Sequence, residues 1–157
     1  MRLALYQPDI PQNTGTILRM AACLQTPVDI IGPAGFDMSD RALKRAGLDY
    51  LSHVNLTRYI SWADFLCWHR QRPQPGRLVL LSARADRTHI SFAFGVSDIL
   101  LLGRESAGVP AEVRAQVDAG VRIPMRPGLR SLNVAVAAAI VLGEALRQTG
   151  GFAPMVD

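Results

Sequence analysis

Three short runs of apolar residues constrain the fold of this chain more than any other feature of its sequence. They span residues 3–6, 78–81 and 99–102, and none of them has polar residues at alternate positions. A strand with one face in water alternates polar and apolar side chains, whereas a strand covered on both faces does not. The runs therefore predict buried strands of a parallel sheet.

Further strands and helices are predicted around these runs. Apolar segments at residues 28–31 and 120–123 are additional strand candidates, and residues 53–57 form a weaker one. Helical patterns separate the strands, and they cover residues 14–24, 39–46, 61–70, 110–117 and 131–149. Strands that alternate with helices predict an α/β fold of the parallel-sheet, layered type.

The helix predicted over residues 14–24 has one apolar face. Its apolar residues repeat at the i, i+3, i+4 and i+7 spacing from Ile17, and Asn13 is a suitable N-cap residue. Arg19 lies about 200° around the helix from Ile17. Its side chain is therefore expected to point away from the core, toward solvent or toward a partner.

The helix predicted over residues 131–149 is apolar around almost its whole circumference between Leu132 and Leu142. A helix of this kind must be covered on nearly all sides. In a chain of 157 residues, a subunit interface is a natural cover for the face that the core leaves open. This pattern predicts a homodimer.

Length, charge and cysteine content limit the class of protein. A chain of 157 residues with 49% hydrophobic residues is expected to form a single domain over residues 1–157. The formal net charge is +4 and Lys44 is the only lysine, so the cationic surface consists almost entirely of arginine. Guanidinium groups bind phosphate through two parallel hydrogen bonds, which is consistent with a nucleic acid partner.

Several features indicate a cytoplasmic protein. Cys23 and Cys67 lie in apolar, helix-like stretches without a partner at disulfide or metal-ligand spacing, which predicts buried thiols in a reducing compartment. The first residues lack the apolar core and cleavage site of a signal peptide. The longest apolar run, residues 134–142, is too short to cross a bilayer, so no membrane span is expected.

Most known catalytic signatures are missing from the sequence. No GxGxxG motif follows a strand, and no serine lies in a GxSxG motif. Residues 103–108 have the glycine spacing of a phosphate-binding loop, but Val109 and Pro110 replace its Lys-Ser/Thr. The three histidines are too scattered for a zinc site, so no metal is expected. Polar loops at strand ends remain, and sites of open α/β sheets form there.

Three segments together resemble, in order and spacing, the three motifs of the SPOUT RNA methyltransferases. They are Pro-Gln-Asn-Thr-Gly-Thr-Ile-Leu-Arg at residues 11–19, Leu-Gly-Arg-Glu-Ser-Ala-Gly-Val-Pro at 102–110, and Ile-Pro-Met-Arg to Ser-Leu-Asn-Val at 123–134. The chain length and residues 45–50 are similar to the single-domain branch that methylates the ribose 2'-hydroxyl of the tRNA wobble nucleotide, which is cytidine or modified uridine at position 34.

The resemblance implies a sheet whose C-terminal part is tied into a trefoil knot, one of the rare exceptions to unknotted chain connections. It also implies that S-adenosyl-L-methionine binds in this knot. The residues implied for cofactor binding come from strand ends and the following loops; they are Leu81, Ser82, Gly103, Glu105, Gly108, Ile123, Met125, Ser131 and Leu132.

The family pattern also implies which residues act at the reacting hydroxyl. They are Arg19, with Asn13, Glu105, Ser131 and Asn133 shaping the site. A guanidinium hardly ever loses its proton, so Arg19 is expected to orient the hydroxyl or the adjoining phosphate, across a dimer seam. Further phosphate or cofactor contacts are expected from Arg122, Arg126 and Arg130. The branch also implies an aromatic residue in the last helix, where this chain has Gly143.

Two other functions stay open at this point. The same chemistry could act on ribosomal RNA, although relatives of that kind usually carry an additional N-terminal RNA-binding domain. A knotted RNA-binding module without catalytic activity is the non-enzyme alternative. The partners expected under the main hypothesis are the tRNA anticodon stem-loop and a second copy of the chain.

Overall fold

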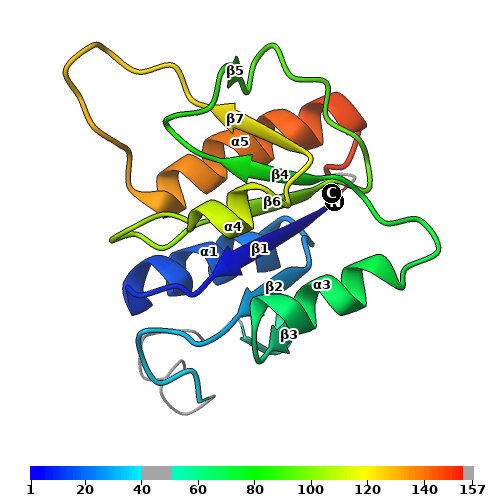
Figure 1. Ribbon diagram of the computed structural model, residues 1–157. Coiled ribbons are helices and arrows are strands. Elements are labelled where there is room, and N and C mark those ends of the chain that lie inside the picture. The colour runs from blue at the N-terminus through cyan, green and yellow to red at the C-terminus, as the bar shows by residue number, and fades with distance from the viewer. Residues whose placement is uncertain (40–50, 154–157) are drawn as a thin grey trace.

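One parallel sheet forms the centre of the structure, a computed structural model that describes residues 1–39 and 51–153 (Figure 1). Its seven strands are β1 (Arg2–Tyr6), β2 (Val28–Ile31), β3 (Leu56–Tyr59), β4 (Leu78–Leu81), β5 (Arg87–Thr88), β6 (Ile99–Leu102) and β7 (Ala119–Arg122). Their spatial order is β3-β2-β1-β6-β4-β7-β5, and all neighbours in the sheet pair in parallel. The predicted α/β parallel-sheet fold is confirmed.

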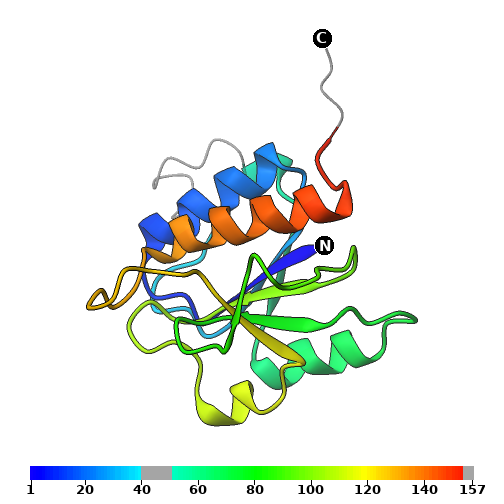
Figure 2. The same ribbon diagram turned by 90° about the horizontal axis from the view of Figure 1, so that it is seen from above.

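Helices cover both faces of this sheet. Helices α1 (Pro11–Cys23) and α5 (Val134–Thr149) lie side by side on one face, and the shorter helices α3 (Trp62–Arg70) and α4 (Ala111–Arg114) lie on the other (Figure 2). A 3-10 turn, η1 (Leu51–His53), precedes β3.

The central strands are apolar over residues 3–6, 78–81 and 99–102 because each face packs against helices. On β1, Leu3 and Leu5 belong to the core that includes α1 and α5, whereas Ala4 and Tyr6 belong to the core that includes α3. All of these side chains are buried. Complete burial of a leucine side chain contributes about 1.5–3 kcal/mol, so both cores stabilise the central strands and the loops that follow them.

The strand predictions are confirmed in the centre of the sheet and are less accurate at its edges. The predicted bounds match β2, β4 and β6, while β1 and β7 each begin one residue earlier than expected. The strand predicted over residues 53–57 exists with shifted bounds: His53 belongs to η1, and β3 spans Leu56–Tyr59. The two-residue strand β5 pairs only with β7 and was not predicted.

All four described α-helices begin at other residues than the sequence predicts, and α4 also ends at Arg114 instead of Val117. Helix α1 starts at Pro11, with Ile10 at the N-cap, so the expectation that Asn13 caps this helix is wrong. Proline is favoured at the first helical position because its missing N–H has no intrahelical partner there. Helix α5 starts at Val134, where the side chain of Asn133 is the N-cap. The helix predicted over residues 39–46 lies almost entirely outside the described residues.

The exposure of the two cysteines, of Arg19 and of helix α5 tests three expectations drawn from the sequence. Cys23 and Cys67 are exposed, so the prediction of buried thiols is wrong; they lie on the outer sides of α1 and α3. Arg19 is exposed on α1, as its position relative to Ile17 predicts. Helix α5 is buried only on its inner side in this single chain. On its outer side, Val136 is 49% exposed and Ile140 is 40% exposed.

Candidate active site

A pocket of about 460 Å³ opens at the carboxyl ends of β4, β6 and β7. This volume lies in the range of about 300–1,000 Å³ that is usual for small-molecule sites. The pocket is lined by all nine residues that the sequence analysis predicts for cofactor binding: Leu81, Ser82, Gly103, Glu105, Gly108, Ile123, Met125, Ser131 and Leu132. The fold thus brings three distant segments of the chain to one cavity.

The loop between β6 and α4 forms one wall of this pocket and is closed on itself. The N–H of Arg104 donates to the carbonyl of Gly108 at 3.0 Å, and the N–H of Gly108 donates to the carbonyl of Arg104 at 2.8 Å. A Cβ atom on Gly103 would lie 2.6 Å from the carbonyl carbon of Gly108. Glycine is therefore required at position 103 by the closure of the loop.

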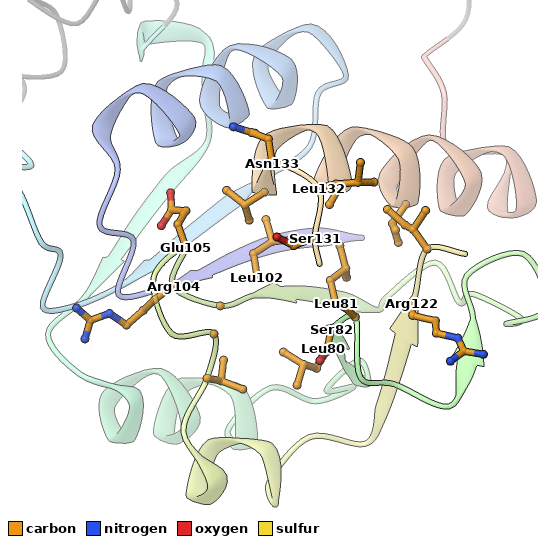
Figure 3. A pocket seen from close by; sticks show the side chains of 18 of the residues that line it. Leu80, Leu81, Ser82, Leu102, Arg104, Glu105, Arg122, Ser131, Leu132 and Asn133 are labelled. Atoms are coloured by element: carbon orange, nitrogen blue, oxygen red, sulfur yellow. The ribbon is translucent and has the colours of Figure 1, made fainter. Parts of the chain in front are cut away.

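Glu105 lies in this loop and connects it to the first turn of α1. Its Oε1 accepts a hydrogen bond from Nδ2 of Asn13 at 3.2 Å, and its Oε2 accepts one from the backbone N–H of Asp9 at 3.1 Å. Both oxygens thus have donors that hold the side chain in place. Figure 3 shows Glu105 beside the pocket, beneath the start of α1.

Asn13 also contacts the last segment of the site. Its Oδ1 accepts a hydrogen bond from Nδ2 of Asn133 at 2.8 Å. Oδ1 of Asn133 caps α5, because it accepts hydrogen bonds from the N–H groups of Ala135 and Val136. Asn13, Glu105 and Asn133 therefore form one hydrogen-bonded chain that joins the three predicted loops.

The electrostatics of this chain centre on two carboxyl groups. Burial raises the pKa of Glu105, and the contact of its side chain with Asp9 raises this pKa further. The pKa of Asp9 is lowered, first by the hydrogen bond of its side chain with Glu105 and also by the hydroxyl of Ser106. When the pH falls, the first proton taken up by this pair therefore goes to Glu105.

Arginines flank the pocket. Arg104 and Arg122 lie at opposite ends and point outward (Figure 3), and Arg114 of α4 also belongs to the lining. Arg126 and Arg130 are exposed in the segment between β7 and α5 but do not line the cavity. Of the three arginines singled out in the sequence, only Arg122 is thus part of the pocket wall.

Among the residues assigned to the reacting hydroxyl, Arg19 is the one that does not line the pocket of its own chain. It lies on the exposed side of α1. A role at the reacting group therefore requires that a second molecule brings this side chain to a pocket.

Sequence reasoning missed Asp9, Arg104 and Arg114. Asp9 follows the first strand closely, which is the signal that could have identified it, because polar residues after parallel strands gather at the same sheet edge.

Within residues 1–39 and 51–153, no group of three metal-ligating side chains occurs. No helix in the same ranges is long and apolar enough to cross a membrane.

The fold and the loops at this sheet edge are those of an RNA methyltransferase family. Residues 1–143 match the SpoU rRNA Methylase family, and the chain belongs to this family. The match confirms the resemblance to SPOUT methyltransferases that the three motifs indicate.

Among its relatives, the tRNA (cytidine(34)-2'-O)-methyltransferase of Beijerinckia indica is 58% identical over 155 residues, which cover 99% of this chain and 96% of the relative.

Solved structures agree with this relationship. A structure that concerns the 2-OH methylation of C/U34 on tRNA superimposes with a TM-score of 0.85 at 45% identity, covering 94% of both chains. The AdoMet-bound rRNA methyltransferase of Sinorhizobium meliloti superimposes with a TM-score of 0.82 at 28% identity. That comparison covers 93% of this chain but 55% of the rRNA enzyme.

Proposed function

We propose that this protein methylates the ribose 2'-hydroxyl of the tRNA wobble nucleotide, cytidine or modified uridine at position 34, with S-adenosyl-L-methionine as methyl donor. The observation that carries this proposal is the hydrogen-bonded chain of Asn13, Glu105 and Asn133 beside a pocket lined by every predicted cofactor residue. The relationship to tRNA position-34 enzymes over nearly the whole chain supports the choice of substrate.

The pocket fits the proposed cofactor in size and chemistry. Apolar side chains of Leu80, Leu102 and Val121 form the inner wall, where an adenine ring would lie between apolar surfaces. The pocket is also lined by Leu81, Ile123, Met125, Ser131 and Leu132, which would hold the cofactor together with this apolar wall. When bound, S-adenosylmethionine supplies an electrophilic methyl group.

The chain's own residues position the substrate. Asn13, Glu105 and Asn133 form a fixed polar surface at the mouth of the pocket, and Ser131 lies next to it. Holding a hydroxyl in line with its target accounts for a large part of the acceleration of such reactions. Arg19 orients the 2'-hydroxyl or the neighbouring phosphate and stays protonated.

The site requires a homodimer in this proposal. The outer side of α5 exposes Val136 and Ile140, next to α1 with Arg19 on its own exposed side (Figure 2). A second subunit that covers this apolar surface brings its Arg19 to the pocket. Exposed apolar surface of this kind is typical of interfaces.

We also propose the trefoil knot for the C-terminal half of the chain. Helix α5 follows β7 near the sheet edge yet packs in the core beside α1. The last turn of α5 contacts the segment after β5, where Gln148 donates to the carbonyl of Phe92 at 3.1 Å and accepts the N–H of Phe94 at 2.9 Å.

A cytoplasmic location follows from the proposed tRNA substrate.

Ribosomal RNA is the second substrate considered. The chain matches 96% of the length of a tRNA enzyme but 55% of the length of the rRNA enzyme from Sinorhizobium meliloti. The size relationship therefore favours tRNA. The complete pocket disfavours the alternative of an RNA-binding module without catalysis. That alternative predicts no heat of binding when S-adenosylmethionine is added in calorimetry.

The test uses purified protein, S-adenosylmethionine and total tRNA from cells that lack the gene. Mass mapping is expected to find one new 2'-O-methyl group at position 34, and ribosomal RNA from the same cells is expected to stay unmodified. Methylation of ribosomal RNA alone, or of neither RNA, would overturn the proposal.

Arg19 is tested by substitution. In Arg19→Ala, turnover is expected to fall about 100-fold, the usual cost of losing one donor to the reacting group, while the affinity for S-adenosylmethionine is unchanged. Arg70→Ala, an exposed arginine at the end of α3, serves as control. Full activity of Arg19→Ala would disprove its role.

The dimer is tested in two ways. Ile140→Glu is expected to produce monomers in sedimentation, whereas Ile60→Glu, an exposed residue beside α3, is expected to leave the oligomer intact. Mixed dimers of Arg19→Ala and Gly103→Ala chains contain one site with both residues intact, so they are expected to regain activity. No recovery on mixing would contradict an Arg19 that acts across the interface.

A further inference from the structure

Asp9 and Glu105 hold each other by reciprocal hydrogen bonds. Asp9 lies in the loop between β1 and α1, 96 residues before Glu105 in the loop after β6. The backbone N–H of Asp9 donates to Oε2 of Glu105 at 3.1 Å, and the backbone N–H of Glu105 donates to Oδ1 of Asp9 at 3.0 Å. Each residue therefore fixes both the backbone and the side chain of the other.

The second oxygen of Asp9 binds the same loop. The hydroxyl of Ser106 donates to Oδ2 of Asp9, and Nε of Arg104 lies 3.7 Å from this oxygen as an ion pair. Three consecutive residues of the loop after β6 thus contact one carboxylate. Asp9 belongs to neither the cofactor residues nor the residues assigned to the reacting hydroxyl.

The orientation of the Asn13 and Asn133 amides follows from this arrangement. A carboxylate only accepts hydrogen bonds, so Glu105 requires the NH₂ group of Asn13. The oxygen of Asn13 then faces Asn133 and requires its NH₂ group, which leaves the oxygen of Asn133 for the N-terminus of α5. If Glu105 turns, or takes up a proton on the oxygen that faces Asn13, this order of donors is lost.

We propose that Asp9 is a positioning residue for methyl transfer: it holds Glu105 in the orientation that aligns Asn13 and Asn133 at the mouth of the pocket. The inference rests on the proposed function, because it assigns Asp9 to the same site. It adds a residue that acts on the reaction through Glu105 and does not touch the substrate itself.

The charges around Glu105 make this role measurable. Asp9 faces it from the loop after β1, Arg104 is its neighbour in its own loop, and Arg114 and Arg122 line the same pocket from α4 and β7. The first turns of α1 and α5 contain no acidic residue. Asp9 is therefore the acidic neighbour of Glu105 among the described residues, and it adds to the effect of burial, which raises the pKa of Glu105.

The test variant is Asp9→Asn. It keeps an oxygen for the N–H of Glu105 but removes the negative charge and the acceptor for Ser106. Turnover on tRNA is expected to fall about tenfold, with KM for tRNA changed less than twofold. Because the active form requires an ionised Glu105, the acidic limb of the pH–rate profile is expected to move to lower pH. Asp86→Asn, an exposed carboxylate after β4, is the control for both readouts.

A change in folding alone would not move the acidic limb. Unchanged turnover in Asp9→Asn, or an acidic limb at the wild-type pH, would overturn the proposal.

A direct titration separates this result from a failure of the proposed function. The pKa of Glu105 can be followed by carbon NMR of its carboxyl group in wild-type protein and in Asp9→Asn, without any RNA. A lower pKa in the variant is expected, and an unchanged pKa would refute the coupling even if no RNA is methylated. If the wild-type enzyme methylates no tRNA but Glu105 titrates as expected, the tRNA substrate is refuted and the coupling between Asp9 and Glu105 stands.

Discussion

Asn133 donates its side-chain N–H to Oδ1 of Asn13 at 2.8 Å, while its own Oδ1 accepts the N–H of Ala135 at the start of α5. One side chain thus has two tasks that can be separated by substitution. The cap contributes to the stability of α5, and under the proposed function the bond to Asn13 aligns the site.

The first prediction separates these tasks. Asn133→Asp keeps an acceptor for the helix N-terminus but cannot donate to Asn13, so its melting temperature is expected to stay near the wild-type value while methyl transfer falls at least tenfold. Asn133→Ala loses both functions, and its free energy of unfolding is expected to drop by about 1 kcal/mol. Thermal unfolding and a methyl-transfer assay measure the two effects. Wild-type activity in Asn133→Asp would show that the bond to Asn13 has no catalytic importance.

The second prediction concerns the closed loop after β6. Gly103→Ala places a Cβ atom 2.6 Å from the backbone of Gly108, so the loop must shift. The free energy of unfolding is expected to fall by about 1–3 kcal/mol, as for other overpacked sites, and calorimetry is expected to show weaker binding of S-adenosylmethionine. Ala107→Ser in the same loop is exposed and serves as control. If Gly103→Ala binds the cofactor normally, the loop closure is not needed for the pocket.

The third prediction concerns a buried ion pair between the neighbouring strands β1 and β2. Asp29 is fully buried in β2 and accepts two hydrogen bonds from Arg2, at 2.7 Å from Nε and at 2.6 Å from the terminal nitrogen. Asp29→Ala leaves the largely buried guanidinium without this partner, which is expected to destabilise the fold by about 3 kcal/mol. Arg147→Ala removes an exposed ion pair with Glu144 and is expected to leave chemical unfolding unchanged. Equal effects of the two substitutions would contradict the importance of burial.

The fourth prediction concerns the pH dependence of stability. Burial lowers the pKa of His69, which stacks on Phe65 with a centroid distance of 6.1 Å. In the unfolded chain a histidine takes up a proton near pH 6.5, whereas folded His69 resists protonation. The contribution of His69 is therefore complete above about pH 6.5 and is lost as the pH falls through the lowered value of the folded state.

His69→Gln removes this titration. Its free energy of unfolding is expected to fall less than that of the wild type between pH 7 and pH 5 in chemical unfolding. Parallel curves for the two proteins would show that His69 does not cause the acid sensitivity.

The centre of the fold could be predicted from the sequence because each run of apolar residues packs into the cores on both faces of the sheet. Leu100 and Leu101 of β6 are both fully buried, on opposite faces of the strand, and few local patterns other than a covered strand explain such neighbours. At the edges the local pattern is weak: β5 has two residues, and its pairing with β7 is a long-range contact.

The site was predicted from motifs and completed by tertiary structure. The motif residues Asn13, Glu105 and Asn133 meet as expected, but the sequence does not show which atoms face each other. Asp9 was missed because its partner is 96 residues away, and contacts across that separation leave no local pattern. The cysteines were misjudged because an apolar neighbourhood does not reveal on which side of a helix a residue lies.

The distance in sequence between the loops of the site also has a consequence for biosynthesis. The ribosome releases the segment with Asn13 early, and β1 can pair with β2 soon afterwards but must wait for β6 on its other side, since Arg2 pairs with Ile99. Pairing over such separations forms slowly compared with local contacts. Asn133 leaves the ribosome later still, together with the helix that encloses the pocket. A nascent chain therefore has no complete site for cofactor or tRNA until almost all of it has been translated.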